Sequence, residues 1–135
     1  MNPKSGSTEK ILIVEENEKQ RILLESILDD KGFQCISKNS GGQAITFIQA
    51  HGPVGVIFAD FTLKEMSGLE FFKMAKNISA ESYLILLSCY HSIDNLASHI
   101  EKEDIHYFIK KPFHIKEVVE QARTGLMHYS TKTSI

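Results

Sequence analysis

Short apolar runs alternate along the chain with longer segments in which apolar residues recur at helical spacing. The runs predict five buried strands, at residues 11–14, 33–37, 54–59, 83–87 and 106–110. The helical spacing predicts five helices, at residues 18–31, 42–50, 67–76, 92–102 and 115–128. This regular alternation of strand and helix predicts βαβ units, and therefore an α/β fold with a parallel sheet.

Capping residues and glycines support several of these boundaries. Asn17 is suited to cap the helix that begins at residue 18, with Gln20 three residues further on. Ser40 is suited to cap the next helix. Gly32 follows the first helix and Gly52 the second, and glycine is typical of helix ends because it tolerates the backbone reversal there.

The composition is that of one ordinary globular domain. The chain has 135 residues, of which 42% are hydrophobic and 24% are charged, and this suffices for a single core. The formal net charge of −2 argues against a general nucleic-acid-binding surface. The apolar runs are far shorter than the ~20 residues that a membrane helix needs. We therefore expect no direct binding to nucleic acid or to a membrane.

Both ends of the chain are polar, and we expect them to be flexible tails. They comprise residues 1–9 and 129–135, on either side of a folded domain at residues 10–128. The first tail has no apolar signal-peptide core, which favours a cytoplasmic location. The two cysteines, Cys35 and Cys89, lack the spacing of a metal site, and we expect both to be reduced and buried.

Chemically active side chains come directly after four of the predicted strands. Glu15 and Glu16 follow the first strand, Asp60 the third, Ser88 the fourth and Lys111 the fifth. Because parallel strands end at the same edge of a sheet, we expect these side chains to lie on one rim. Open α/β sheets bind their ligands at that rim.

This ordered set of strand ends resembles the receiver domain of two-component response regulators. The resemblance covers roughly residues 10–127. It implies a flavodoxin-like, doubly wound (βα)5 fold whose parallel five-stranded sheet has the order 2-1-3-4-5. The matching pieces are Ile-Leu-Ile-Val-Glu-Glu at 11–16, Val-Ile-Phe-Ala-Asp at 56–60, Met-Ser-Gly at 66–68, Leu-Leu-Ser-Cys at 86–89 and Phe-Ile-Lys-Lys-Pro-Phe at 108–113.

The resemblance implies a role in phosphorelay signal transduction. Asp60 would accept a phosphoryl group from a sensor histidine kinase, a phosphotransfer protein or a small acyl phosphate. A Mg²⁺ cofactor would be held by Glu15, Glu16, Asp60 and the backbone carbonyl of Thr62, because Mg²⁺ prefers oxygen ligands. Such a protein is not an enzyme beyond its own phosphorylation and dephosphorylation. A flavin-binding alternative would need a phosphate-binding loop where this chain has Glu-Glu-Asn-Glu, at residues 15–18.

The resemblance also implies how the phosphoryl group would act on the rest of the domain. Ser88 and Lys111 match the hydroxyl and the lysine that contact it, and Phe108 matches an aromatic switch residue. Pro112 matches a proline that typically follows a cis peptide bond, here Lys111–Pro112. Phosphorylation would then alter the surface of the fourth helix, fifth strand and fifth helix. A downstream protein, a fused output domain or a second copy of the chain would bind there.

Positions 16, 64 and 67 depart from the family's pattern. Glu16 stands where the family usually has the shorter aspartate, Lys64 where it usually has proline, and Ser67 where it usually has aspartate. Because Mg²⁺ demands near-octahedral geometry, the longer Glu16 predicts weak binding. Glu16 and Lys64 favour an alternative, a pseudo-receiver that keeps the fold with weak or no phosphorylation and acts as an interaction module. Tyr90 and Thr62 match positions that control water access to the phosphoryl group.

Overall fold

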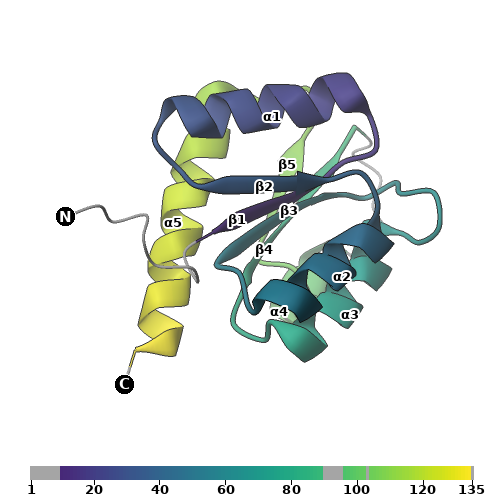
Figure 1. Ribbon diagram of the computed structural model, residues 1–135, viewed down its shortest axis with the longest axis vertical. Helices are drawn as coiled ribbons and strands as arrows, with labels where there is room; N and C mark the ends of the chain where they lie inside the picture. Colours follow the sequence, from purple (N-terminus) through teal and green to yellow (C-terminus); the bar gives the residue numbers. More distant parts are fainter. Residues whose placement is uncertain (1–9, 90–95, 103, 135) are drawn as a thin grey trace.

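The computed structural model describes residues 10–89, 96–102 and 104–134. Its centre is a five-stranded, wholly parallel sheet with the order β2-β1-β3-β4-β5 (Figure 1), which confirms the predicted fold. The strands are β1 Ile11–Val14, β2 Cys35–Lys38, β3 Val56–Asp60, β4 Tyr83–Ser88 and β5 Tyr107–Lys110. The helices are α1 Glu18–Asp30, α2 Gly41–His51, α3 Gly68–Ile78, α4 Leu96–Glu101 and α5 Ile115–Thr133.

Helices cover both faces of the sheet and make two separate cores. Figure 1 shows α1 and α5 on one side of the sheet, and α2, α3 and α4 on the other. Alternate residues of a strand point to opposite faces. In β3, Val56 and Phe58 therefore pack in the core under α1 and α5, which we call the α1/α5 core. Ile57 and Ala59 pack in the core under α2 and α3, which we call the α2/α3 core.

The predicted caps are confirmed where local hydrogen bonds define them. The Asn17 side chain accepts a hydrogen bond from the backbone N–H of Gln20 at 3.0 Å, and α1 begins at the next residue after Asn17. The Ser40 hydroxyl accepts from the N–H of Gln43 at 3.1 Å and starts α2 in the same way. Gly52, which ends α2, has φ 93°, a conformation that glycine adopts without strain.

Helix α5 extends further than the sequence predicted. It continues through Thr133, so the expectation of a flexible tail is wrong for residues 129–133. The physical reason is the burial of Tyr129, which is only 5% exposed and prolongs the apolar face that includes Ala122. Close approach to the sheet adds to this anchoring. A Cβ on Gly125 would lie 2.7 Å from side-chain atoms of Tyr83 and Val56.

Some other expectations are corrected or fall outside the described residues. Cys89 is exposed and Cys35 is half-buried, so the prediction that both are buried is wrong. Strand β2 is shifted, since it spans Cys35–Lys38 and not residues 33–37. Residues 1–9 and 92–95 lie outside the described residues. No helix in the described part of the chain combines the length and the apolarity needed to cross a membrane.

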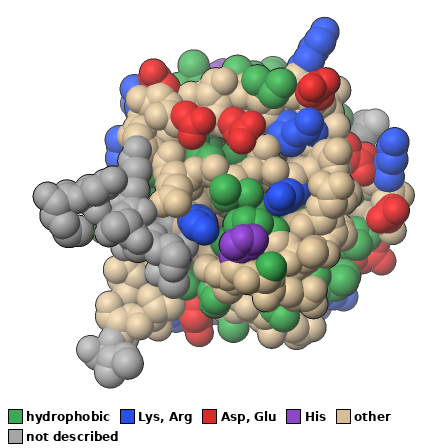
Figure 2. All heavy atoms as spheres, in the orientation of Figure 1, with side chains coloured by type: hydrophobic (Ala, Val, Ile, Leu, Met, Phe, Trp, Pro, Cys, Tyr) green, Lys and Arg blue, Asp and Glu red, His purple; other side chains and the backbone are tan. Residues whose placement is uncertain are grey.

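The β2 edge of the sheet carries positive charge over an aromatic ring. The Nζ atoms of Lys10 and Lys38 lie 5.5 Å and 5.3 Å from the centre of the Phe47 ring, and His51 stacks on that ring at 4.4 Å. Figure 2 shows basic and histidine side chains gathered around hydrophobic atoms on this face of the molecule. Lysine on an edge strand discourages pairing with another chain.

Candidate functional site

Four side chains from separate elements meet at the carboxyl edge of the sheet. Asp60 is the last residue of β3 and Ser88 the last residue of β4, whereas Glu15 directly follows β1 and Lys111 directly follows β5. Because β3 lies between β1 and β4, Asp60 is central on this rim. The backbone N–H of Lys111 donates to the carbonyl of Ser88 at 2.8 Å, which fixes the β5 end of the rim.

The ammonium group of Lys111 lies between two carboxylates. Its Nζ is 2.8 Å from Oε1 of Glu15 and 3.1 Å from Oδ1 of Asp60. The side chains of Lys111, Glu15 and Asp60 are only 10%, 2% and 13% exposed. An ammonium between two sheltered carboxylates offsets their mutual repulsion. Lys111 therefore stabilises the folded state with Glu15 and Asp60 close together.

The surroundings of Asp60 raise the pKa of its carboxyl group above the ordinary value of 3.8. Burial is the main cause, because it disfavours the charged form, and the negative charge of Glu15 adds to it. Lys111 opposes both through its charge and its hydrogen bond. Asp60 is thus a carboxylate whose ionised form is sheltered from water and is held next to one cation.

Glu15 is fixed by contacts at both of its carboxylate oxygens. Oε1 faces Lys111, and Oε2 accepts a hydrogen bond from the backbone N–H of Asn17 at 3.1 Å. The backbone carbonyl of Glu15 also accepts from the guanidinium of Arg21 at 2.9 Å. Arg21 was not among the predicted site residues. Its only signal is its position one turn after Asn17, which places it beside the start of α1.

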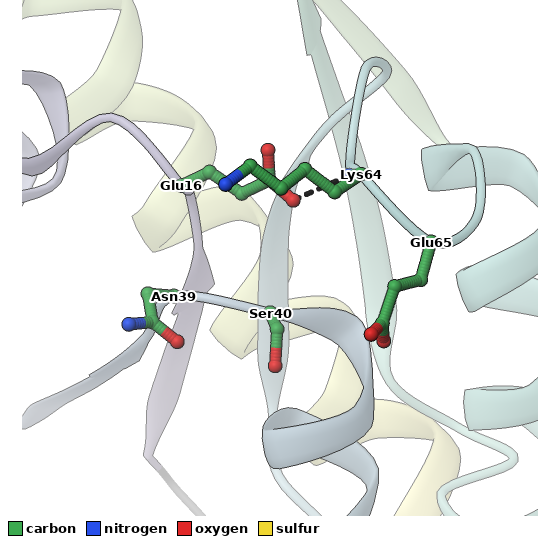
Figure 3. Close-up of a pocket in the computed structure, with 5 residues that line it drawn as sticks. All are labelled: Glu16, Asn39, Ser40, Lys64 and Glu65. Atoms are coloured by element: carbon green, nitrogen blue, oxygen red, sulfur yellow. Dashed lines mark hydrogen bonds between the residues drawn. The ribbon is translucent and has the colours of Figure 1, made fainter.

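Glu16 bonds to a neighbouring loop. Its Oε2 accepts a hydrogen bond from the backbone N–H of Lys64, in the loop between β3 and α3 (Figure 3). The two residues line one side of a polar hollow of about 250 Å³, opposite Asn39 and Ser40, with Glu65 completing the lining. The Glu16 carboxylate is therefore engaged with Lys64, while Lys111 joins Glu15 and Asp60.

The donors expected to hold Mg²⁺ do not converge. Among the residues that the structure describes, no three His, Cys, Asp or Glu side chains are grouped so that they could hold a metal ion. Glu15 is bonded to Lys111 and Asn17, and Glu16 is bonded to Lys64. Thr62 pairs with Ser67 in an isolated antiparallel bridge. In the observed arrangement these side chains bond to other groups, so the Mg²⁺ ligand set stays a prediction.

The two predicted switch residues lie on adjacent strands. Ser88 is buried at 2% exposure in β4, and its register partner in β5 is Lys110. Phe108 is half-buried, packs against the α2/α3 core, and is paired in register with Leu86. Tyr107 faces the α1/α5 core, as strand alternation requires, and its hydroxyl donates to Glu117 at 2.9 Å.

The peptide bond between Lys111 and Pro112 is cis, as predicted. Pro112 and Phe113 line a small hollow with Gln20 and Leu23 of α1, so this loop leans towards the first helix. Tyr90, expected to control water access, lies outside the described residues.

His106 was not predicted to have a structural role, yet it joins β4 and β5 near the amino ends of the strands. Its backbone N–H donates to the carbonyl of Leu84 at 2.8 Å, and its ring Nδ1 accepts from the N–H of Leu84 at 3.0 Å. The ring also stacks on Tyr83, with 4.9 Å between centroids, and meets His128 at the same distance. No local sequence pattern signals such a pairing.

A family model described as the response regulator receiver domain matches residues 11–123 of the chain. The match includes Asp60 and Lys111 and spans every strand of the sheet.

Three relatives from Bacillus subtilis (strain 168) show the same similarity over most of this chain. Sporulation initiation phosphotransferase F is 30% identical over 118 residues, which are 87% of this chain and 94% of the relative. Chemotaxis protein CheY is 30% identical over 112 residues, or 82% of this chain and 92% of CheY. The uncharacterized transcriptional regulatory protein YkoG is 29% identical over 123 residues, or 91% of this chain. The chain spans about half of YkoG, 53% of its length.

A solved structure supports the fold alone. The crystal structure of a response regulator receiver domain protein from Clostridium thermocellum has a TM-score of 0.83 and 17% sequence identity. The alignment covers 93% of this chain and 99% of that one.

Proposed function

This chain belongs to the receiver-domain family of response regulators, and on that premise we propose that Asp60 accepts a phosphoryl group and thereby switches protein contacts. The observation that carries the proposal is the ammonium of Lys111, 3.1 Å from the Asp60 carboxylate at the end of a central strand. A cation at that distance would neutralise charge that arrives with a phosphoryl group.

The transfer would be a substitution at phosphorus. A carboxylate oxygen of Asp60 attacks the phosphorus of a phosphohistidine or of an acyl phosphate. A new P–O bond forms, the P–N or P–O bond to the donor breaks, and its electron pair leaves with the imidazole or the carboxylate. The aspartyl phosphate product brings more negative charge next to Lys111, whose ammonium is then attracted to the phosphoryl oxygens.

The switch would run from Ser88 to the surface of α4, β5 and α5. A hydrogen bond from the Ser88 hydroxyl to the phosphoryl group would draw the end of β4 towards Asp60. Phe108, packed beside Leu86 on the neighbouring strand, would follow by moving inward. Such a group shifts the balance between two states only by bonding better to one of them, and Ser88 and Lys111 provide that difference.

The partners proposed for this function are a sensor histidine kinase or phosphotransfer protein as donor, and a downstream protein as target. The chain would catalyse no more than its own phosphorylation and dephosphorylation. The proposal includes a metal set of Glu15, Glu16, Asp60 and the Thr62 carbonyl. Glu16 would have to leave Lys64 before it could join this set.

The bond between Glu16 and Lys64 also favours a second candidate function. If Glu16 stays bonded to Lys64, the chain would be a pseudo-receiver, an interaction module with weak or no phosphorylation.

Intact-mass measurement separates the two functions. The wild-type chain and the Asp60→Asn variant are incubated with acetyl phosphate and Mg²⁺, and Asp30→Asn, an exposed change at the end of α1, serves as the control. We expect one phosphoryl group on the wild type and on Asp30→Asn, and none on Asp60→Asn. An adduct that persists in Asp60→Asn would move the acceptor elsewhere. A wild type that stays unmodified, with acetyl phosphate and with phosphohistidine donors, would favour the pseudo-receiver.

A further inference from the structure

The hydrogen bond between Glu16 and Lys64 joins two loops that are distant in the sequence. Glu16 belongs to the loop between β1 and α1, and Lys64 lies near the tip of the loop between β3 and α3. Figure 3 shows the Glu16 side chain reaching across to the Lys64 backbone, with the dashed line marking the bond. The acceptor is a carboxylate, which makes this a charge-assisted bond and stronger than one between neutral groups.

Both residues are needed for this bond, and each for a different physical reason. The donor is the backbone N–H of residue 64, which a proline would lack. The acceptor must reach across to the neighbouring loop, and an aspartate at position 16 would be one methylene shorter. Glu16 and Lys64 are also two of the positions that depart from the family's pattern. The structure makes these two departures a single interaction.

We propose that Glu16 is a positioning residue, which holds the β3–α3 loop in place and must release it before its carboxylate can serve a divalent cation. We call the bond between Glu16 Oε2 and the Lys64 N–H the loop latch. The Glu16 carboxylate is held at the Lys64 N–H, whereas the ammonium of Lys111 joins Glu15 and Asp60. The latch and the cation therefore compete for the Glu16 side chain. The competition, unlike the latch, rests on the function proposed above.

The rest of the loop is already fixed, so the latch controls its tip. At the base, the Gly68 N–H donates to the carbonyl of Phe61 at 2.7 Å, and Thr62 forms a bridge with Ser67. In the middle, Leu63 is buried at 7% exposure in the α2/α3 core. Residues 64 and 65 are exposed, and the latch is the bond that ties this exposed tip to another element. The loop begins directly after Asp60, so the latch also orders the surface that a phosphoryl donor would approach.

The latch itself is tested by NMR on the ¹⁵N-labelled chain without metal. A charge-assisted bond should move the amide proton of Lys64 downfield and slow its exchange with solvent. We expect Glu16→Ala to abolish the downfield shift and to speed exchange by roughly tenfold or more. Glu16→Gln keeps an acceptor oxygen and should have a smaller effect. Glu65→Gln removes a charge from the same hollow and should change nothing. A Lys64 amide signal that is the same in the wild type and in Glu16→Ala would overturn the latch.

The competition is tested by titrating Mg²⁺ into Lys64→Pro and Lys64→Ala and following the amide signals around Asp60. Both variants lose the ammonium of Lys64, but only Lys64→Pro loses the N–H. We expect Lys64→Pro to bind Mg²⁺ roughly tenfold more tightly, because its Glu16 is free of the latch. Equal affinity in the two variants would overturn the competition. If no variant binds Mg²⁺, the competition fails together with the proposed metal set. The latch is then still decided by the Lys64 amide.

Discussion

Gly68 packs directly against the backbone carbonyl of Asp60. A Cβ at position 68 would overlap that oxygen and would lie 2.8 Å from Cδ1 of Leu86. The first turn of α3 therefore rests on the end of β3, at the residue that carries the proposed acceptor. The Ser67 cap and Glu70 form a capping box that fixes where this turn begins.

Gly68→Ala should destabilise the fold and disturb the acceptor together. The added methyl group meets backbone, which cannot move aside as a side chain can, so we expect a loss of about 1–3 kcal/mol in the free energy of unfolding. Chemical denaturation measures this loss, and the rate of acetyl phosphate labelling measures the displacement of Asp60. Gly42→Ala is the control, because no atom lies within 4 Å of its Cβ. That helical change should stabilise by about 0.5–1 kcal/mol. Equal stability of Gly68→Ala and wild type would show that α3 shifts easily.

Lys111→Ala should fold but should lose both stability and activation. It leaves the carboxylates of Glu15 and Asp60 sheltered without their cation, which we expect to cost about 2–4 kcal/mol near neutral pH. The loss should shrink at lower pH, because one of the acids then binds a proton. Denaturation curves at several pH values check this, with Lys110→Ala, an exposed neighbour, as the control. A loss that is independent of pH would mean that packing of the lysine stem, and not its charge, is the cause.

Asp60→Asn should stabilise the protein at neutral pH. The pKa of Asp60 is higher in the folded state than its ordinary value of 3.8. Between the ordinary pKa and the raised one, the native state therefore binds more protons than the unfolded state. The free energy of unfolding therefore falls as the pH rises through that window, and this cost persists above it. An uncharged asparagine removes the cost. We expect Asp60→Asn to melt higher than wild type at pH 7, with the difference vanishing below pH 3.8. A variant that melts lower at pH 7 would show that the attraction of Lys111 outweighs burial.

Ser88→Ala should separate phosphorylation from the response to it. The variant retains Asp60 and Lys111, so it should still accept the phosphoryl group. It lacks the hydroxyl proposed to bond that group, and each such charge-assisted bond contributes about 1.5–3 kcal/mol to the population shift. We expect the NMR shift changes across α4 and α5 on phosphorylation to fall well below those of wild type. Cys89→Ala, at the exposed next position, is the control. A full wild-type response in Ser88→Ala would exclude the coupling.

The elements and the rim were predictable because their signals are local. The caps at Asn17 and Ser40 depend on side chains that bond three residues ahead, and the sequence displays such spacing directly. The meeting of Asp60 with Lys111 followed from strand order, since parallel strands end on one edge.

What the sequence could not predict depends on contacts between distant segments. The bond from Glu16 to Lys64 was not predicted, because nothing local indicates that the N–H of Lys64 lies within reach. The last turn of α5 was interpreted as tail because the burial of Tyr129 depends on the path of the helix across the sheet. The pairing of His106 with Leu84 is equally non-local.

The division of the interior into two cores has a consequence for the evolution of such a chain. Leu86 belongs to the α2/α3 core, and Phe108, the proposed switch residue, packs on it. Phe58 and Val118 belong to the α1/α5 core. Substitutions in the α1/α5 core that lie away from the proposed α5 surface would alter chiefly the abundance and thermal stability of the protein. Substitutions in the α2/α3 core around Leu86 and Phe108 would alter the response as well. Mutations that repack the α2/α3 core are therefore a route by which the response can change while the α1/α5 core keeps the domain folded.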